Sequence, residues 1–246
     1  MARRRLRNKR VLLFLSEALA IGLGVFLSLW ADEWRTNRSR AAESRESLAR
    51  LAVNLSDDTT EWARLAGLNE RSVEAIRSML ATDPYAADAS STVAELIPFT
   101  LESAVLAPSG QEYEALESSG RLGLVSDARL LGALALYYRR QEYVAELYRS
   151  DVEQSHDVAE LMYPHVEFPR DVFTHSSQPA DASASTQSFI PTPTAAPSAV
   201  GLLSDRVFVN EMTFLGFLKQ LLVNALSELE TMADDILAMI ELELEG

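Results

Sequence analysis

Residues Val11 to Trp30 form an apolar run that restricts the fold and location of this chain more than any other segment. The run contains 20 residues, lacks proline, and has Glu17 as its single ionisable side chain. A helix of that length extends about 30 Å, because each residue adds about 1.5 Å, and the hydrocarbon core of a bilayer is about 30 Å thick. The run therefore predicts one transmembrane helix, with the lipid bilayer as a partner.

The charges beside the run predict its orientation. Residues 1–10 carry six basic and no acidic side chains, whereas the rest of the chain carries 16 basic and 36 acidic ones. A basic segment next to a span stays in the cytoplasm under the positive-inside rule. We expect a bacterial inner-membrane protein that crosses once, with its N-terminus in the cytoplasm and its bulk in the periplasm or outside.

A cleaved signal peptide is the alternative interpretation of the same run. The apolar core of a signal peptide is usually about 7–15 residues long and is followed by small residues at the cleavage site. This run is longer, and Leu29, Trp30 and Ala31 make a poor cleavage site. An uncleaved signal anchor is therefore favoured.

Small side chains recur every four residues within the run, at Ser16, Ala20, Gly24 and Ser28. At about 100° per residue they share one helix face, and Glu17 falls on the same face. Stripes of small residues let membrane helices approach closely. The stripe predicts a homo-oligomer through the span, and the alternative is that Glu17 merely reaches the cytoplasmic headgroups.

The rest of the chain predicts an all-α fold in which the span continues into a long helix. Apolar residues at alternating spacings of three and four mark its packed seam, which Asp58, Asn69 and Ser72 interrupt. The seam residues are Leu48, Leu51, Leu55, Trp62, Leu65, Ile76 and Met79. Because the seam is interrupted, it favours a helical bundle over a free coiled coil, with the helix ending near residue 80 before Pro84.

Shorter helices are expected next. Ser90 to Thr92 offer N-caps for a helix over residues 93–105, and a second short helix over residues 112–118 is closed by Gly120. Asp127 is the expected N-cap of a long helix over residues 128–162.

Composition changes abruptly at Pro164. Six of the nine prolines fall between residues 164 and 197, among many serines and alanines, so residues 164–200 are interpreted as a loop or linker. A last helix follows to about residue 243, and its apolar residues from Leu215 to Met239 keep the most regular three-and-four spacing in the chain, with Phe214 and Phe217 expected to widen this apolar face. The predicted organisation is a basic tail over 1–10, the span over 11–30, the first part of the bundle over 31–163, the loop over 164–200, and the C-terminal bundle helix over 201–246.

Composition also excludes several functions. The acidic bulk of the chain argues against binding nucleic acid. Cysteine is absent, so thiolate chemistry is excluded. Glu153 and His156 form a single Glu-x-x-His, whereas di-iron bundles need two such motifs, and His165 and His175 lack the spacing of zinc ligands. We predict no cofactor, no metal site, no catalytic residues and no enzymatic activity.

Two segments resemble an uncharacterised bacterial family of single-pass membrane proteins, described only as a domain of unknown function. The first is SEALAIGLGVFLSLWADEW, where Glu17, Gly24, Leu29 and Trp34 match the family pattern and serines replace a usual glycine and alanine. The second is YEALESSGRLGLVSDARLLGALALYY. Its matching positions are Tyr113, Leu116, Ser118, Ser119, Gly120, Asp127, Leu130, Tyr137 and Tyr138. The resemblance implies the architecture and the location, and it implies no activity.

The predicted function is that of a non-enzymatic membrane-anchored scaffold or interaction protein with an unknown protein partner. One alternative is a membrane effector that acts through oligomerised spans. A second alternative is an extracytoplasmic sensor or ligand-binding domain that acts through the long helix.

Overall fold

One continuous helix, α1 (Ala2–Ala81), occupies the first third of the chain. The computed structural model describes residues 2–104, 110–125, 127–166 and 197–245, and the side chains of residues 2–22 lie outside the described part. No proline occurs before Pro84, so nothing interrupts the backbone hydrogen bonds of this helix. The helix ends at a turn in which the amide of Tyr85 donates to Asp83 Oδ1 at 3.0 Å. The prediction of a helix ending near residue 80 is confirmed.

The other described elements are also helical, and no strand occurs within the described ranges. They are α2 (Ala89–Thr100), α3 (Gln111–Ser118), the 3₁₀ turn η1 (Arg121–Leu124), α4 (Ala128–Met162), the 3₁₀ turn η2 (Tyr163–His165), α5 (Ala199–Leu203) and α6 (Arg206–Glu245). The all-α prediction is therefore confirmed.

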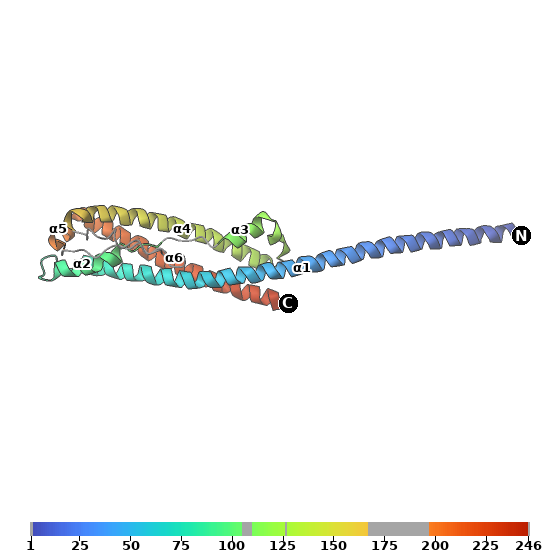
Figure 1. Cartoon of the computed structure of the whole chain (residues 1–246), viewed down its shortest axis with the longest axis horizontal. Coiled ribbons are helices and arrows are strands. Elements are labelled where there is room, and N and C mark those ends of the chain that lie inside the picture. Colours follow the sequence, from blue (N-terminus) through green and yellow to red (C-terminus); the bar gives the residue numbers. More distant parts are fainter. Residues whose placement is uncertain (1, 105–109, 126, 167–196, 246) are drawn as a thin grey trace, which may run out of the picture.

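Helices α1, α4 and α6 lie lengthwise against one another and form the body of the bundle (Figure 1). Helix α6 runs opposite to α1 and α4, and its backbone approaches both of them closely. The short helices α2 and α5 lie at the far end of the bundle, and α3 lies near the end from which α1 emerges. The N-terminal part of α1 projects well beyond the bundle (Figure 1).

The bundle core consists of two apolar clusters. The cluster nearer the projecting part of α1 is built on the seam from Leu48 to Ala66, with α4 residues up to Tyr148 and α6 residues from Leu222 onward. The far cluster joins Ile76 and Met79 to α2, α5 and the start of α6. The helices also bury several polar side chains in the interior of the bundle. All seven predicted seam residues of α1 are buried.

Sequence signals also predict most of the helix ends. Asp127 caps α4, since Asp127 Oδ1 accepts from the amide of Arg129 at 2.7 Å. Gly120 follows α3 with φ of +70°, a left-handed conformation that favours glycine.

The predicted bounds of the first short helix are wrong. Helix α2 starts at Ala89 and ends at Thr100, and its N-cap is Asp88. Ser91 is not the cap, because its hydroxyl donates backward to the carbonyl of Asp88 at 2.8 Å. Pro98 lies within the last turn of α2, which ends two residues later.

The two ends of the proline-rich tract pack against the bundle. Val166 and Ala199 are buried, and the short helix α5 begins at Ala199 with Ser198 as its cap. Residues 167–196, the middle of the predicted loop, lie outside the described residues.

Helix α6 buries most of the periodic face predicted for it. Leu215, Leu222 and Leu229 are fully buried. Phe214 and Phe217 were expected to widen that face, but both are exposed and their rings stack at 6.3 Å. They lie on the side of α6 away from its most deeply buried residues. The three-and-four spacing alone does not show which residues at the edge of the apolar face are covered by other helices.

Candidate functional site

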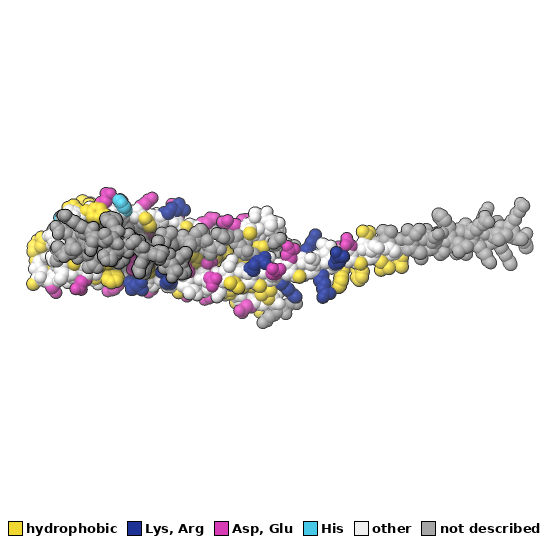
Figure 2. Space-filling view, viewed as in Figure 1, with side chains coloured by type: hydrophobic (Ala, Val, Ile, Leu, Met, Phe, Trp, Pro, Cys, Tyr) yellow, Lys and Arg dark blue, Asp and Glu magenta, His cyan; other side chains and the backbone are white. Residues whose placement is uncertain are grey.

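The part of α1 outside the bundle carries large apolar side chains that are exposed to solvent. We call residues 23–40 the projecting segment. The exposed fractions of its large apolar side chains are 59% for Leu23, 67% for Phe26, 52% for Leu27, 65% for Leu29, 59% for Trp30 and 55% for Trp34. Figure 2 shows hydrophobic side chains gathered along this part of the helix, followed by basic ones toward the bundle. Exposed apolar patches of this kind are typical of sites that contact another protein or a membrane.

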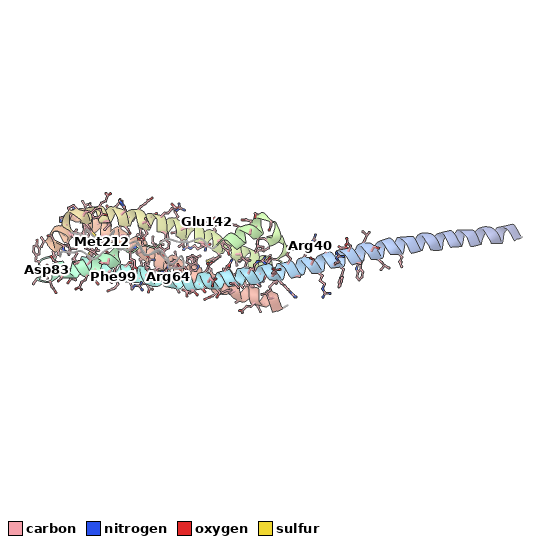
Figure 3. The ribbon with its side chains drawn as sticks, in the orientation of Figure 1. Arg40, Arg64, Asp83, Phe99, Glu142 and Met212 are labelled. Atoms are coloured by element: carbon pink, nitrogen blue, oxygen red, sulfur yellow. The ribbon has the colours of Figure 1, made fainter. Side chains whose placement is uncertain are left out.

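One stripe of the projecting segment changes in chemistry along its length. Leu23, Leu27, Trp30 and Trp34 follow spacings of four, three and four, so they share a helix face. Arg38 extends the stripe by one turn, and its guanidinium lies 5.4 Å from the centre of the Trp34 ring. Along the stripe, aliphatic side chains are thus followed by aromatic ones and then by a cationic one. Arg40 marks the point at which α1 meets the bundle (Figure 3).

The predicted association face is described only in part. The side chains of Ser16, Glu17 and Ala20 lie outside the described residues. At Gly24, no atom lies within 4 Å of the position that a Cβ would occupy, so the backbone is open there. Ser28 satisfies its hydroxyl locally, since its Oγ donates to the carbonyl of Gly24 at 2.8 Å. The structure contains a single copy of the chain.

Within the part of the chain whose side chains are described, no helix has an apolar stretch long enough to cross a membrane. The predicted span over residues 11–30 lies largely outside that part. Its side chains are described only at residues 23, 24 and 26–30.

Buried polar groups connect α1 with α4. The phenol of Tyr137 donates to Asp58 Oδ2 at 2.6 Å and accepts from Trp62 Nε1 at 2.9 Å. Three turns farther along, Asn69 Nδ2 donates to Tyr148 Oη at 3.0 Å. Two of the three seam interruptions, Asp58 and Asn69, therefore hold tyrosines from α4. The long tyrosine side chains span the gap between two helices whose backbones approach each other less closely than either approaches α6.

The third interruption, Ser72, donates to the carbonyl of Leu68 at 3.2 Å within its own helix. A serine that bonds to the preceding turn satisfies its hydroxyl without a tertiary partner.

A buried ion pair joins α4 to α6. Lys219 Nζ lies 3.0 Å from Asp151 Oδ1, and both side chains are fully buried. Asp151 Oδ2 accepts from Ser103 Oγ at 2.9 Å, and Ser103 Oγ lies 3.2 Å from Ser155 Oγ. Lys219 also donates to the carbonyl of Glu102 at 2.8 Å, so the pair holds the chain segment after α2 against the bundle.

The electrostatics of these groups follow from burial. Burial lowers the pKa of Lys219 below its ordinary value, and Asp151 acts in the opposite direction. Burial raises the pKa of Tyr137, and the hydrogen bond to Asp58 raises it further. Burial also raises the pKa of Tyr148. Each of these polar side chains is held by other protein groups in the interior, which is the environment of a structural network.

The tyrosines of the second resembling segment lie beside a small cavity. Tyr113 stacks on Tyr138 with ring centres 4.1 Å apart, and Tyr138 meets Tyr137 edge to face at 5.1 Å. The cavity has a volume of about 260 Å³, and its lining includes Gly110, both stacked rings and the carboxylates of Glu114, Glu117 and Glu142. Gly120 and Asp127 shape the chain around α3 and are not among the residues that line this cavity. Trp34 lies far away, on the projecting segment.

The described histidines have local partners. His156 Nδ1 lies 3.6 Å from Glu160 Oε1 on the exposed side of α4. His165 packs close to Gly201, where an added Cβ would lie 2.8 Å from its Nδ1. His175 lies outside the described residues. Within the described ranges, no group of three or more His, Asp and Glu side chains is arranged to hold a metal ion.

Three features of the structure were not among the sequence-based predictions. Asp151 and Lys219 had no predicted role, although Lys219 is the only lysine after residue 10 and falls within the most regular apolar pattern of the chain. Asp58 and Asn69 have the same 11-residue separation as Tyr137 and Tyr148, a spacing that could have indicated their pairing. On the projecting segment, the four-residue spacing of Trp34 and Arg38 could have indicated their contact.

Comparisons of the chain with protein-family models, with curated proteins and with solved structures find no match.

Proposed function

We propose that this protein is a non-enzymatic membrane-anchored scaffold or interaction protein, in which α1 enters the bilayer and holds the helical bundle at its surface. The observation that carries the proposal is the exposure of Leu23, Phe26 and Trp30 on the part of α1 that projects beyond the bundle (Figure 1). Transferring each such side chain from water to an apolar environment contributes about 1.5–3 kcal/mol. A bilayer supplies that environment around the whole circumference of a helix.

The apolar run over residues 11–30 supports the same proposal. It is long enough to span the hydrocarbon core, and the exposed residues 23–30 form its C-terminal part. Trp30 and Trp34 then fall at the interface, where tryptophan is enriched in membrane proteins. The basic tail favours a cytoplasmic N-terminus, so the proposal places the bundle on the opposite side of a bacterial inner membrane.

The interior of the bundle supports a binding role over catalysis. Its buried carboxylates and lysine bond to one another and to tyrosine and serine hydroxyls, so they are engaged in holding the helices together. The exposed pair Phe214 and Phe217 offers an apolar surface to a protein partner. Replacing both with serine should leave the fold intact and reduce the size of the native complex in mild detergent. An unchanged complex would count against this surface.

Self-association through the span is a further part of the proposal. The open backbone at Gly24 supports it, because small residues allow close helix contact in membranes. Crosslinking of Glu17→Leu and Gly24→Leu in membranes should give less oligomer than the wild type. Equal yields in both variants would contradict association along this face.

Alkaline extraction of membranes tests the anchoring proposal directly. Arginine near the centre of a span costs about 2.5–3.5 kcal/mol for insertion, so the double variant Leu23→Arg, Phe26→Arg should lose its membrane attachment. The matched control is Val53→Arg, Val152→Arg, which places the same charges at exposed apolar positions of the bundle. Wild type and control should stay in the membrane pellet. Release of the wild type, or full retention of the Leu23→Arg, Phe26→Arg variant, would contradict the proposal.

A further inference from the structure

The projecting segment carries arginines that make no ion pair. Among the described residues, Arg35, Arg38 and Arg40 contact no acidic side chain closely enough for a salt bridge. Within the bundle, the same helix pairs three of its five arginines with acidic side chains of the described residues. The pairs are Arg50 with Glu46, Arg64 with Glu61, and Arg77 with Glu74. The arginines that follow the apolar stripe are therefore available to an external acceptor.

Arg35 and Arg38 are three residues apart and lie on neighbouring positions of the helix surface. Two cations at this spacing repel each other unless an anion lies between them. The nearby carboxylates, Asp32 and Glu33, do not fill this role in the structure, since neither forms a salt bridge with these arginines. The geometry thus leaves room for a shared anionic partner.

The Arg38 guanidinium is also held in place by a ring. It lies 5.4 Å from the centre of Trp34, a distance at which a cation interacts favourably with an aromatic face. A guanidinium that stacks on a ring still presents N–H donors at its edge. That planar edge matches two oxygens of a phosphate group, which is why arginine is preferred over lysine at such sites.

The axial order of the side chains matches one leaflet of a bilayer. Successive residues are about 1.5 Å apart along a helix, so Trp34 lies about 6 Å beyond Trp30, and Arg38 lies about 6 Å beyond Trp34. Aliphatic residues come first, amphipathic rings second and arginines third. Hydrocarbon, interface and phosphates follow one another in the same order.

We propose that Arg35 and the Trp34–Arg38 pair bind the phosphates of phospholipid headgroups and thereby set the depth at which α1 leaves the bilayer. This inference rests on the membrane anchoring proposed above. It adds the lipid group that α1 contacts where it leaves the bilayer. The partner is the phosphate group of the lipid, which zwitterionic and anionic phospholipids share. The segment 32–40 carries two acidic and three basic side chains, so its net charge is too small for the general attraction of an acidic membrane to account for this binding.

Tryptophan fluorescence can locate the segment in the bilayer. The chain has three tryptophans, and Trp62 is buried in the bundle, so Trp30 and Trp34 report on the projecting segment. The full-length protein is reconstituted in phosphatidylcholine vesicles whose acyl chains carry bromine at a shallow or a deep position. The variants Trp30→Phe and Trp34→Phe assign the signal to one ring or the other. Deep bromine should quench Trp30 more than Trp34, because Trp34 lies about 6 Å farther from the hydrocarbon core.

The arginine contact is measured in the same vesicles by solid-state NMR, as dephasing of the guanidinium carbons by lipid phosphorus. The double variant Arg35→Gln, Arg38→Gln should show less of this dephasing than the wild type, and its Trp34 should become more accessible to deep bromine. The control Arg71→Gln, an exposed position of α1 inside the bundle, should retain both signals. Inorganic phosphate added to protein in maltoside micelles should not perturb Trp34, because the proposed ligand is the lipid.

The outcomes separate this inference from the anchoring proposal. If bromine quenches neither Trp30 nor Trp34, the anchoring proposal fails and this inference fails with it. If Trp30 is quenched but the arginine variant behaves as the control does, anchoring stands and headgroup binding is overturned. Perturbation of Trp34 by inorganic phosphate would also overturn the assignment to lipid.

Discussion

Lys219 Nζ and Asp151 Oδ1 lie 3.0 Å apart between α6 and α4, with both side chains fully buried. The pair falls where the two apolar clusters of the core meet, between Leu215 and Leu222 on α6. A lysine in that position forms its ion pair only when α6 is correctly aligned with α4, because a shift of one turn would bury each charge without its partner. The pair therefore fixes the register of a helix whose regular apolar pattern would otherwise tolerate sliding.

Removing one member of this pair should destabilise the bundle strongly. Lys219→Met leaves Asp151 buried without its cation, and breaking a buried pair in this way typically costs about 3–5 kcal/mol. Urea unfolding, followed by circular dichroism, measures the loss. The double variant Lys219→Met, Asp151→Asn should recover much of it, because no uncompensated charge stays buried. A double variant no more stable than Lys219→Met alone would show that the charge itself is not the cause.

Alkaline pH should destabilise the protein through its buried tyrosines. Burial raises the pKa of Tyr137 and Tyr148 above their ordinary value of 10.0, so each keeps its proton in the folded chain at a pH where the unfolded chain loses it. Stability is fully present below about pH 10 and falls above it, by about 1.4 kcal/mol for each tyrosine and each pH unit. Lys219 acts in the opposite sense, since its lowered pKa adds stability as pH rises toward 10.5.

The measurement is the free energy of unfolding between pH 9 and pH 11. The double variant Tyr137→Phe, Tyr148→Phe should have a flatter decline than the wild type, although it is less stable at every pH because Asp58 and Asn69 lose a partner. Tyr85→Phe, at a fully accessible position, is the control and should not change the slope. Equal slopes in all three proteins would contradict the assignment to the buried phenols.

Two glycines should respond to alanine with opposite signs. Gly67 lies inside α1 with no atom within 4 Å of an added Cβ, so Gly67→Ala should stabilise the fold by about 0.5–1 kcal/mol. Gly120 has φ of +70°, so Gly120→Ala should destabilise it by about 1–2 kcal/mol despite equally open space. Thermal unfolding of the two variants tests the difference. A similar shift in both would mean that backbone conformation does not decide the effect at Gly120.

The long helices of this fold could be predicted because local signals agree with tertiary packing. Proline positions and the cap at Asp127 set the ends of α1 and α4, and three-and-four spacing identified the buried seam of α1. Membership in the family of membrane proteins that the two segments resemble stays a prediction.

The polar contacts could not be predicted because they depend on which helices become neighbours. Asp58 and Asn69 resemble defects in a seam when α1 is considered alone. Their role appears only when α4 lies parallel to α1, so that an equal spacing of 11 residues aligns them with Tyr137 and Tyr148. Likewise, periodicity on α6 could not show that Phe214 and Phe217 face outward. That depends on where α1 and α4 cover the helix.

Helix α1 connects the proposed membrane anchor to the bundle. The same 80-residue helix provides the proposed anchor and one wall of the bundle, with no proline between the two parts. The register contacts at Asp58 and Asn69 lie on this helix as well. A displacement of α1 relative to the membrane would therefore be transmitted directly to α4 and α6.

Labelling of single cysteines tests the membrane anchor most directly, since the chain has no cysteine of its own. Four variants sample the proposed topology: Asn8→Cys in the basic tail, Leu23→Cys in the apolar run, and Ser39→Cys and Ala87→Cys beyond it. In spheroplasts, a membrane-impermeant maleimide should label residues 39 and 87, should leave residue 23 unlabelled, and should label residue 8 only after lysis. Labelling of residue 23 as fast as residue 39, or of residue 8 before lysis, would contradict a helix that crosses the membrane in this orientation.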